Sequence, residues 1–151
     1  MLNERNSKAS IGALNVIART LSQSIVMYLA EVNPRASSPP HPGLTALHSV
    51  ADDQRALIDE IALFILERRG IVDRGAYPIE FTDLHDLSID YLVNQAVKYL
   101  SQDLRTIEQA AGHIKNDERA AALAERVIGA TKAHLELLNE RSIQSEVSGP
   151  R

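Results

Sequence analysis

The chain has 151 residues, a length that suits one domain with a single hydrophobic core, and its 44% apolar and 24% charged residues are typical of a globular protein. The net charge of −4 and the scatter of arginines among acids argue against nucleic acid or an anionic membrane surface as partner. The absence of cysteine excludes disulfides, thiolate metal sites and cysteine nucleophiles, and it fits a cytoplasmic protein. We expect no signal peptide, and no apolar run approaches the roughly 20 residues that span a bilayer.

Residues 10–32 are predicted to form the first helix. Apolar side chains recur there at alternating steps of three and four, which places them on one stripe of a helix. Ser10 is the expected N-cap, so residues 1–9 are expected to be a flexible N-terminus. Four prolines in residues 33–43 oppose helix and favour a stiff connection within the same domain.

Residues 44–69 are predicted to form the second helix. Its apolar inner face is interrupted by Gln54. Gly70 follows two arginines and is the expected glycine stop of this helix, because cations favour the negative end of the helix dipole.

The eleven residues 71–81 are longer than the about 2–8 residues that antiparallel helices need. Extended, they reach about 36 Å, close to the roughly 40 Å length of the second helix. The sequence therefore predicts a long crossover, anchored to the bundle by Tyr77, Phe81 and Tyr91. The ion pairs expected around it join Arg68, Arg69 and Arg74 to Asp73, Glu80 and Asp83.

The third and fourth helices are predicted at residues 82–114 and 118–141. Thr82 or Asp83 is the expected N-cap of the third helix, and residues 115–117 form the turn between the two. Residues 142–151 are expected to be a flexible C-terminal tail. Four amphipathic helices over residues 10–141 predict one all-α domain, a four-helix bundle.

The pattern resembles the ferritin-like superfamily of ferritins, rubrerythrins and Dps-type proteins. Residues 56–70, ALIDEIALFILERRG, are similar to the second helix of that family and its glycine stop, and residues 84–138 are similar to its last helix pair. The resemblance covers most of the chain in pattern and helix layout. It implies a ferritin-like four-helix bundle with a long crossover between the second and third helices.

The di-iron site of that family takes a Glu from each of two helices and a Glu-x-x-His from each of the other two. Those ligand motifs are largely missing here, because His134 is preceded by Thr131 and the second helix carries Gln54-x-x-Leu57. We therefore predict no cofactor. The alternative is a divergent iron or manganese site that draws on Gln54, Asp103 and His134.

Other polar residues have two interpretations each. Gln54 and Thr131 are expected to be buried and hydrogen-bonded to one another or to the backbone, with a relic of a lost metal site as the alternative. His48 and Asp52, one helical turn apart, are expected to form a surface ion pair or hydrogen bond, with a shared metal ion as the alternative.

A polar cluster stands at the start of the third predicted helix. It comprises His85, Asp86 and Asp90, beside Tyr91. We interpret Asp83 and Asp86 as the cap and dipole partners of the helix and expect His85 to pack on the crossover; a ligand cluster that binds metal is the alternative.

The predicted function is that of a structural or interaction protein without a complete metal site, with no catalytic residue assigned. The expected assembly is a homo-oligomer, of which a dimer is one form. The fourth helix offers small side chains that suit helix–helix contact, namely Ala120, Ala121, Ala122 and Ala124. The alternative functions are a divergent metal-binding redox or storage protein and a Dps-like shell protein.

Overall fold

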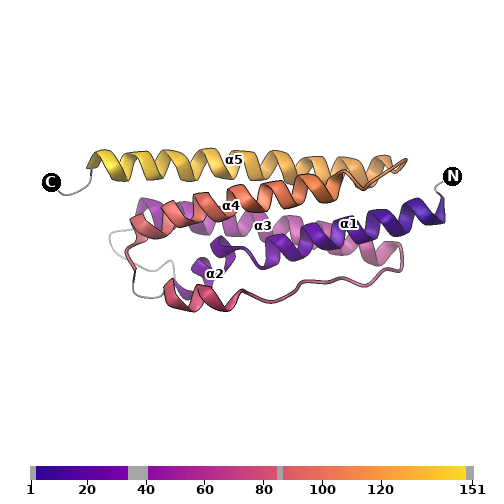
Figure 1. The fold of residues 1–151 in the computed structure, drawn as a ribbon, viewed down its shortest axis with the longest axis horizontal. Helices are drawn as coiled ribbons and strands as arrows, with labels where there is room; N and C mark the ends of the chain where they lie inside the picture. Colours follow the sequence, from indigo (N-terminus) through magenta and orange to yellow (C-terminus); the bar gives the residue numbers. More distant parts are fainter. Residues whose placement is uncertain (1–2, 34–40, 85–86, 149–151) are drawn as a thin grey trace.

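The computed structural model describes residues 3–33, 41–84 and 87–148, with the side chains of residues 83 and 143–148 left out. These ranges are all-helical and contain no β-strand, which confirms the predicted all-α class. Figure 1 shows four long helices side by side, with two short helical segments beside them. The long helices are α1 (Glu4–Ser22), α3 (Pro42–Glu67), α4 (Ile89–Ala111) and α5 (Glu118–Ser148), and the short segments are α2 (Ile25–Val32) and the 3-10 helix η1 (Ile79–Leu84).

All four long helices contribute to one hydrophobic core, because α1 contacts α3, α4 and α5, and α5 also contacts α3 and α4. Each fully buried aliphatic side chain stabilises the fold by about 1.5–3 kcal/mol. None of the helices in the described ranges is apolar over enough length to cross a membrane. The largest fully buried side chains on these four helices are Leu14, Ile17, Leu21, Leu47, Ile61, Ile65, Leu92, Leu100, Ile107 and Leu138.

The prediction of the first helix is wrong in two respects, because the helix starts earlier than expected and is not continuous. It begins at Glu4, where the side chain of Asn3 caps it, and Ser10 is a buried residue inside α1 rather than a cap. The helix then breaks before Ser24, whose Oγ accepts a hydrogen bond from the backbone nitrogen of Met27 and so caps α2. A serine in an apolar stretch thus starts a new helix, since its hydroxyl competes for backbone donors.

The end of α3 also differs from the predicted glycine stop. Arg69, with φ of 62°, is the residue in the left-handed conformation, and Gly70 follows it. The nitrogen of Gly70 donates to the oxygen of Ile65 at 2.9 Å, which closes a Schellman motif one residue earlier than expected. Glycine is needed at position 70 for space, because a Cβ there would lie 2.8 Å from Ile65 and 3.0 Å from Ile11.

Residues 71–78 form an extended segment that leads from the end of α3 along the bundle to η1 and the start of α4 (Figure 1). Asn15 on α1 holds its backbone, because the side chain donates to the oxygen of Ile71 at 2.7 Å and accepts from the nitrogen of Asp73 at 2.8 Å. Gly75, with φ of 63°, turns the segment closely over α1.

Aromatic packing anchors this segment, as predicted for Tyr77 and Phe81. The ring centroid of Tyr28 lies 5.3 Å from that of Tyr77 and 5.6 Å from that of Phe81, and Phe81 contacts Tyr99 at 5.5 Å. The prediction for Tyr91 is wrong, because its side chain is 46% exposed. Tyr28 of α2 and Tyr99 of α4 complete the aromatic cluster in its place.

The third predicted helix is shorter than expected at both ends. Thr82 and Asp83 lie in η1, so neither caps it, and α4 begins at Ile89 with Ser88 as its N-cap. Residues 85–86, part of the proposed polar cluster, lie outside the described residues. The fourth helix begins at Glu118 as predicted but continues to Ser148, seven residues beyond the expected end at 141.

Candidate functional site

The three residues considered for a divergent metal site lie in separate surroundings. His134 is buried on α5, and its Nε2 lies 2.9 Å from Oδ2 of Asp53 on α3. The Oε1 of buried Gln54 accepts a hydrogen bond from Ser24 Oγ at 2.8 Å. Asp103 lines a cavity between α1, α4 and the extended segment. Gln54 and His134 thus contact different residues, and no contact within the described segments brings either of them together with Asp103.

A di-metal centre does not fit these residues. Such a centre needs several carboxylates and two imidazoles that converge on one point. Within the described ranges, no group of three or more His, Cys, Asp or Glu side chains is arranged to hold a metal ion. Gln54 would have to bind through the oxygen that already accepts the proton of Ser24.

One predicted pairing of polar residues is confirmed in its backbone form, and the other is wrong. Thr131 donates to the backbone oxygen of Val127 on its own helix at 2.8 Å, so it is not the partner of Gln54. His48 is buried, and its Nε2 lies 2.6 Å from the backbone oxygen of Asn33 rather than at a surface pair with Asp52. Thr131 thus bonds within its own helix, His48 connects α3 to the residue that follows α2, and the two side chains do not gather into a site.

A buried polar clamp joins α1, α3 and α5 at one end of the bundle; we define it as Ser10, Arg68 and Asp117. Oδ2 of Asp117 accepts from Arg68 Nη1 and from Ser10 Oγ, each at 2.5 Å, and Oδ1 accepts from Arg68 Nη2 at 3.0 Å. Asp117 Oδ1 also accepts from the nitrogen of Ala120, which caps α5. Arg68 therefore pairs with Asp117, and the prediction that it pairs with the acids of the crossover is wrong.

The other ion pairs predicted around the crossover also differ. Asp73 accepts from Arg19 of α1 at 3.2 Å, and Arg74 lies 3.9 Å from Asp59 of α3. The arginines therefore connect the extended segment to neighbouring helices.

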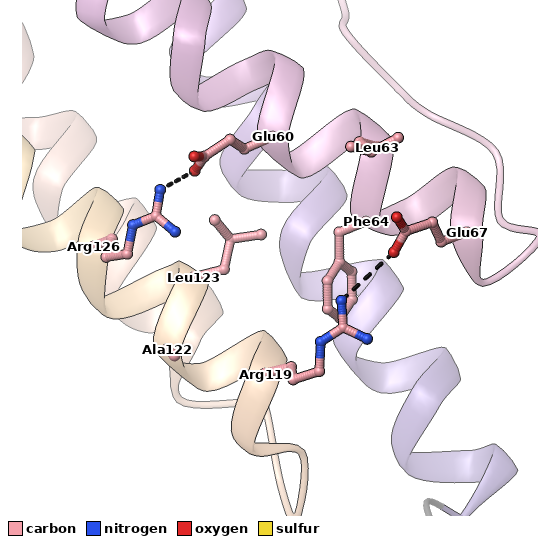
Figure 2. A pocket seen from close by; sticks show the side chains of 8 residues that line it. All are labelled: Glu60, Leu63, Phe64, Glu67, Arg119, Ala122, Leu123 and Arg126. Carbon is pink, nitrogen blue, oxygen red and sulfur yellow. Dashed lines mark hydrogen bonds and ion pairs between the residues drawn. The ribbon is translucent and has the colours of Figure 1, made fainter.

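A groove of about 300 Å³ runs between α3 and α5 near the polar clamp. Figure 2 shows its floor of Phe64 and Leu123 and the two ion pairs that cross it. Arg126 pairs with Glu60, and Nη2 of Arg119 lies 3.5 Å from Oε2 of Glu67. The residues that line the groove are Glu60, Leu63, Phe64, Glu67, Arg119, Ala122, Leu123 and Arg126.

The charges of this groove are sorted by helix. Both acids come from α3 and both arginines from α5, and Leu63 between them is 60% exposed. Sequence reasoning missed this arrangement. The signal was available, because the acids are seven residues apart on one helix and the arginines seven apart on another.

Comparison of the chain with protein-family models, with curated proteins and with solved structures finds no match. The role of the groove is therefore inferred from its own geometry and charge.

Proposed function

We propose that this chain is a structural protein of ferritin-like helix layout that acts through self-association, with two copies packing face to face across the α3–α5 groove. The groove supports this proposal because it combines an exposed leucine with charges of opposite sign on its two walls. The course of residues 71–78 along the bundle supports the ferritin-like layout. The absence of cysteine is in keeping with a cytoplasmic location.

The single observation that carries the proposal is the sorting of charge between the two helices. The helices are antiparallel, since Glu60 pairs with Arg126 while Glu67 pairs with Arg119. A two-fold axis along the groove, in the plane of contact, sets α3 of each copy over α5 of the other at the same height. Each acid then faces an arginine of the second copy.

The charge pattern also disfavours the other face-to-face arrangement, in which the two-fold axis runs across the groove. A two-fold axis across the groove would set α3 over α3, so that Glu60 and Glu67 met acids, and α5 over α5, so that Arg119 and Arg126 met arginines. Like charges that face each other across an interface disfavour association by several kcal/mol. The charge pattern thus favours a second copy as occupant and one orientation of that copy.

The experiment uses two charge variants and their mixture. The double variant Glu60→Arg, Glu67→Arg makes both walls basic, and Arg119→Glu, Arg126→Glu makes both walls acidic. Each variant alone should be monomeric by analytical ultracentrifugation, because every facing pair becomes repulsive. The equimolar mixture should form a one-to-one dimer, since each wall then faces its opposite.

Two leucines provide a matched control on α3. Leu63 and Leu66 are 60% and 59% exposed, but only Leu63 lines the groove. Leu63→Glu should abolish the dimer, and Leu66→Glu should leave it intact. Wild-type protein that is a monomer at about 100 µM, or a mixture of charge variants that stays monomeric, would overturn the proposal.

A further inference from the structure

A second cavity, of about 290 Å³, lies on another side of the molecule. It is bounded by α1, the start of α2, the extended segment with η1, and α4. Its size is at the lower limit of cavities that bind small organic molecules. The lining residues are Val16, Arg19, Thr20, Gln23, Ile25, Pro78, Phe81, Tyr99, Asp103 and Thr106.

The threonines of this cavity have already used their protons. Thr20 Oγ1 donates to the backbone oxygen of Val16 at 2.7 Å, and Thr106 Oγ1 donates to that of Gln102 at 3.4 Å. A hydroxyl has one proton, so each oxygen can only accept a further hydrogen bond. The two threonines therefore offer acceptors to a ligand.

Asp103 adds a third acceptor of the same kind. Its carboxylate forms no hydrogen bond or ion pair with any other residue in the described part of the chain. Burial raises its pKa to about 7, so a partner that supplied positive charge and N–H donors would favour the ionised form.

Arg19 is the cationic side chain in the lining of the cavity, and it pairs with a residue other than Asp103. Its Nη1 donates to Oδ2 of Asp73 at 3.2 Å. Gly75 lies closely over the aliphatic part of Arg19, because a Cβ there would come within 2.6 Å of Arg19 Cγ. The guanidinium is thus directed to the extended segment, which leaves Asp103 to a ligand.

The apolar part of the lining complements these acceptors. Phe81 and Tyr99 meet edge to face, with ring centroids 5.5 Å apart. Aromatic rings attract cations through their faces and also bury apolar groups well. A carboxylate, hydroxyl acceptors and aromatic rings in one cavity match a cation with an organic body.

We propose that this cavity binds a small organic ammonium compound, whose N–H groups donate to the carboxylate of Asp103 and to the oxygens of Thr20 and Thr106. The apolar part of the ligand lies against Phe81 and Tyr99. A bare divalent ion is disfavoured, since Asp103 is the single carboxylate among the lining residues and such ions take several oxygen ligands. The site is separate from the α3–α5 groove, so it does not depend on dimer formation.

The test compares two probes that differ in charge. Phenethylamine is cationic at neutral pH, and phenethyl alcohol is a neutral compound of the same shape. Binding to the full chain is measured by isothermal titration calorimetry and by NMR shifts of residues around the cavity. The amine should bind at least about tenfold more tightly than the alcohol, because a charge-assisted hydrogen bond is lost in the alcohol.

Asp103→Asn removes the charge and keeps the shape. It should weaken phenethylamine binding by about tenfold or more and leave the alcohol unaffected. The matched control is Glu108→Gln, a change on the exposed face of the same helix, outside the cavity. Circular dichroism and thermal unfolding check that Asp103→Asn is folded. We expect it to fold, because the substitution removes a carboxylate whose charged form is disfavoured by burial.

Binding should also weaken as the pH falls from about 8 to about 6, because Asp103 then takes up a proton. The other titratable groups at the wall are Arg19 from α1 and Tyr99 from α4, while Pro78 and Phe81 from the crossover side carry no charge. Equal affinity for amine and alcohol would overturn the proposal. So would full affinity in folded Asp103→Asn, or the absence of amine binding at millimolar concentration.

Discussion

Two sets of ion pairs connect the same two parts of the chain, the α3 region and the α5 region, and they differ in burial. In the polar clamp the side chains of Arg68 and Asp117 are 17% and 2% exposed. In the groove those of Arg119 and Glu67 are 74% and 53% exposed. Water screens the exposed pair, so it adds little to folding and remains available for a partner, whereas the buried pair holds the bundle end together.

Replacing Asp117 by alanine should have the largest effect on stability. The change leaves the largely buried guanidinium of Arg68 without its partner and removes the cap of α5. Loss of one member of a buried pair costs about 3–5 kcal/mol. Urea unfolding at neutral pH, followed by circular dichroism, measures this cost; a change below about 1 kcal/mol would remove the distinction between the two sets of pairs.

The clamp should also make the free energy of unfolding depend on pH in the acidic range. Burial acts to raise the pKa of Asp117, but hydrogen bonds from Arg68, Ser10 and the Ala120 nitrogen, with the charge of Arg68, lower it overall. The resulting stabilisation is present above the unfolded pKa of about 3.9 and is lost as the pH falls through the lower folded value. Urea unfolding between about pH 5 and pH 2 should show this loss in wild type, and Asp117→Asn should lack it.

Asp103, unlike Asp117, is a carboxylate without a hydrogen-bonded or charged partner among the residues that the structure describes. Burial raises its pKa to about 7, so between about pH 4 and pH 7 the folded state holds a proton that the unfolded state has released. Stability should therefore fall as the pH rises through this window, opposite in sign to the contribution of Asp117. The unfolding temperature, measured across this pH window, should change less with pH in Asp103→Asn than in wild type.

Replacing Ser10 by alanine should have a smaller effect than the loss of Asp117. The variant removes one donor to the carboxylate but leaves both contacts from Arg68 in place. A hydrogen bond to a charged group contributes about 1.5–3 kcal/mol, and that range sets the expected loss. Chemical denaturation of Ser10→Ala and Asp117→Ala side by side compares their losses in the free energy of unfolding. An equal loss in both variants would mean that Ser10 contributes as much to stability as Asp117.

The smallest effect is expected for Glu67→Gln in the groove. The exposed pair with Arg119 contributes less than about 1 kcal/mol to folding. The same substitution should nevertheless weaken the dimer, and more so at low salt, where charges are least screened. Sedimentation at two salt concentrations measures the second effect, which would be absent if the groove had no partner.

The helical content and the core were predictable from the sequence, because apolar spacing directly encodes which side of a helix is buried. Leu47, Ile61 and Ile65 on α3, for example, follow from the stripe alone, and all three are fully buried. The break before Ser24 was not predictable in this way. The apolar stripe continues through it, and besides capping α2 the Ser24 hydroxyl contacts Gln54, which lies thirty residues away in the chain.

The candidate site was less predictable than the fold. The residues singled out for metal binding, Gln54 and His134, are polar at apolar positions, but their partners Ser24 and Asp53 are set by packing between helices. The clamp arises because the end of α3, the middle of α1 and the start of α5 meet. Pairings of this kind depend on tertiary geometry, which sequence spacing within one helix does not contain.

The break before Ser24 has a consequence for how the chain behaves before it is folded. Residues 25–30, IVMYLA, are buried without exception, and they carry no charge and no proline. Such a run is prone to form intermolecular β-structure whenever it is exposed, and Glu31 directly after it is the kind of charged flank that limits this. In the folded chain α3 and α4 cover α2, so any opening of that contact would expose the run to other molecules.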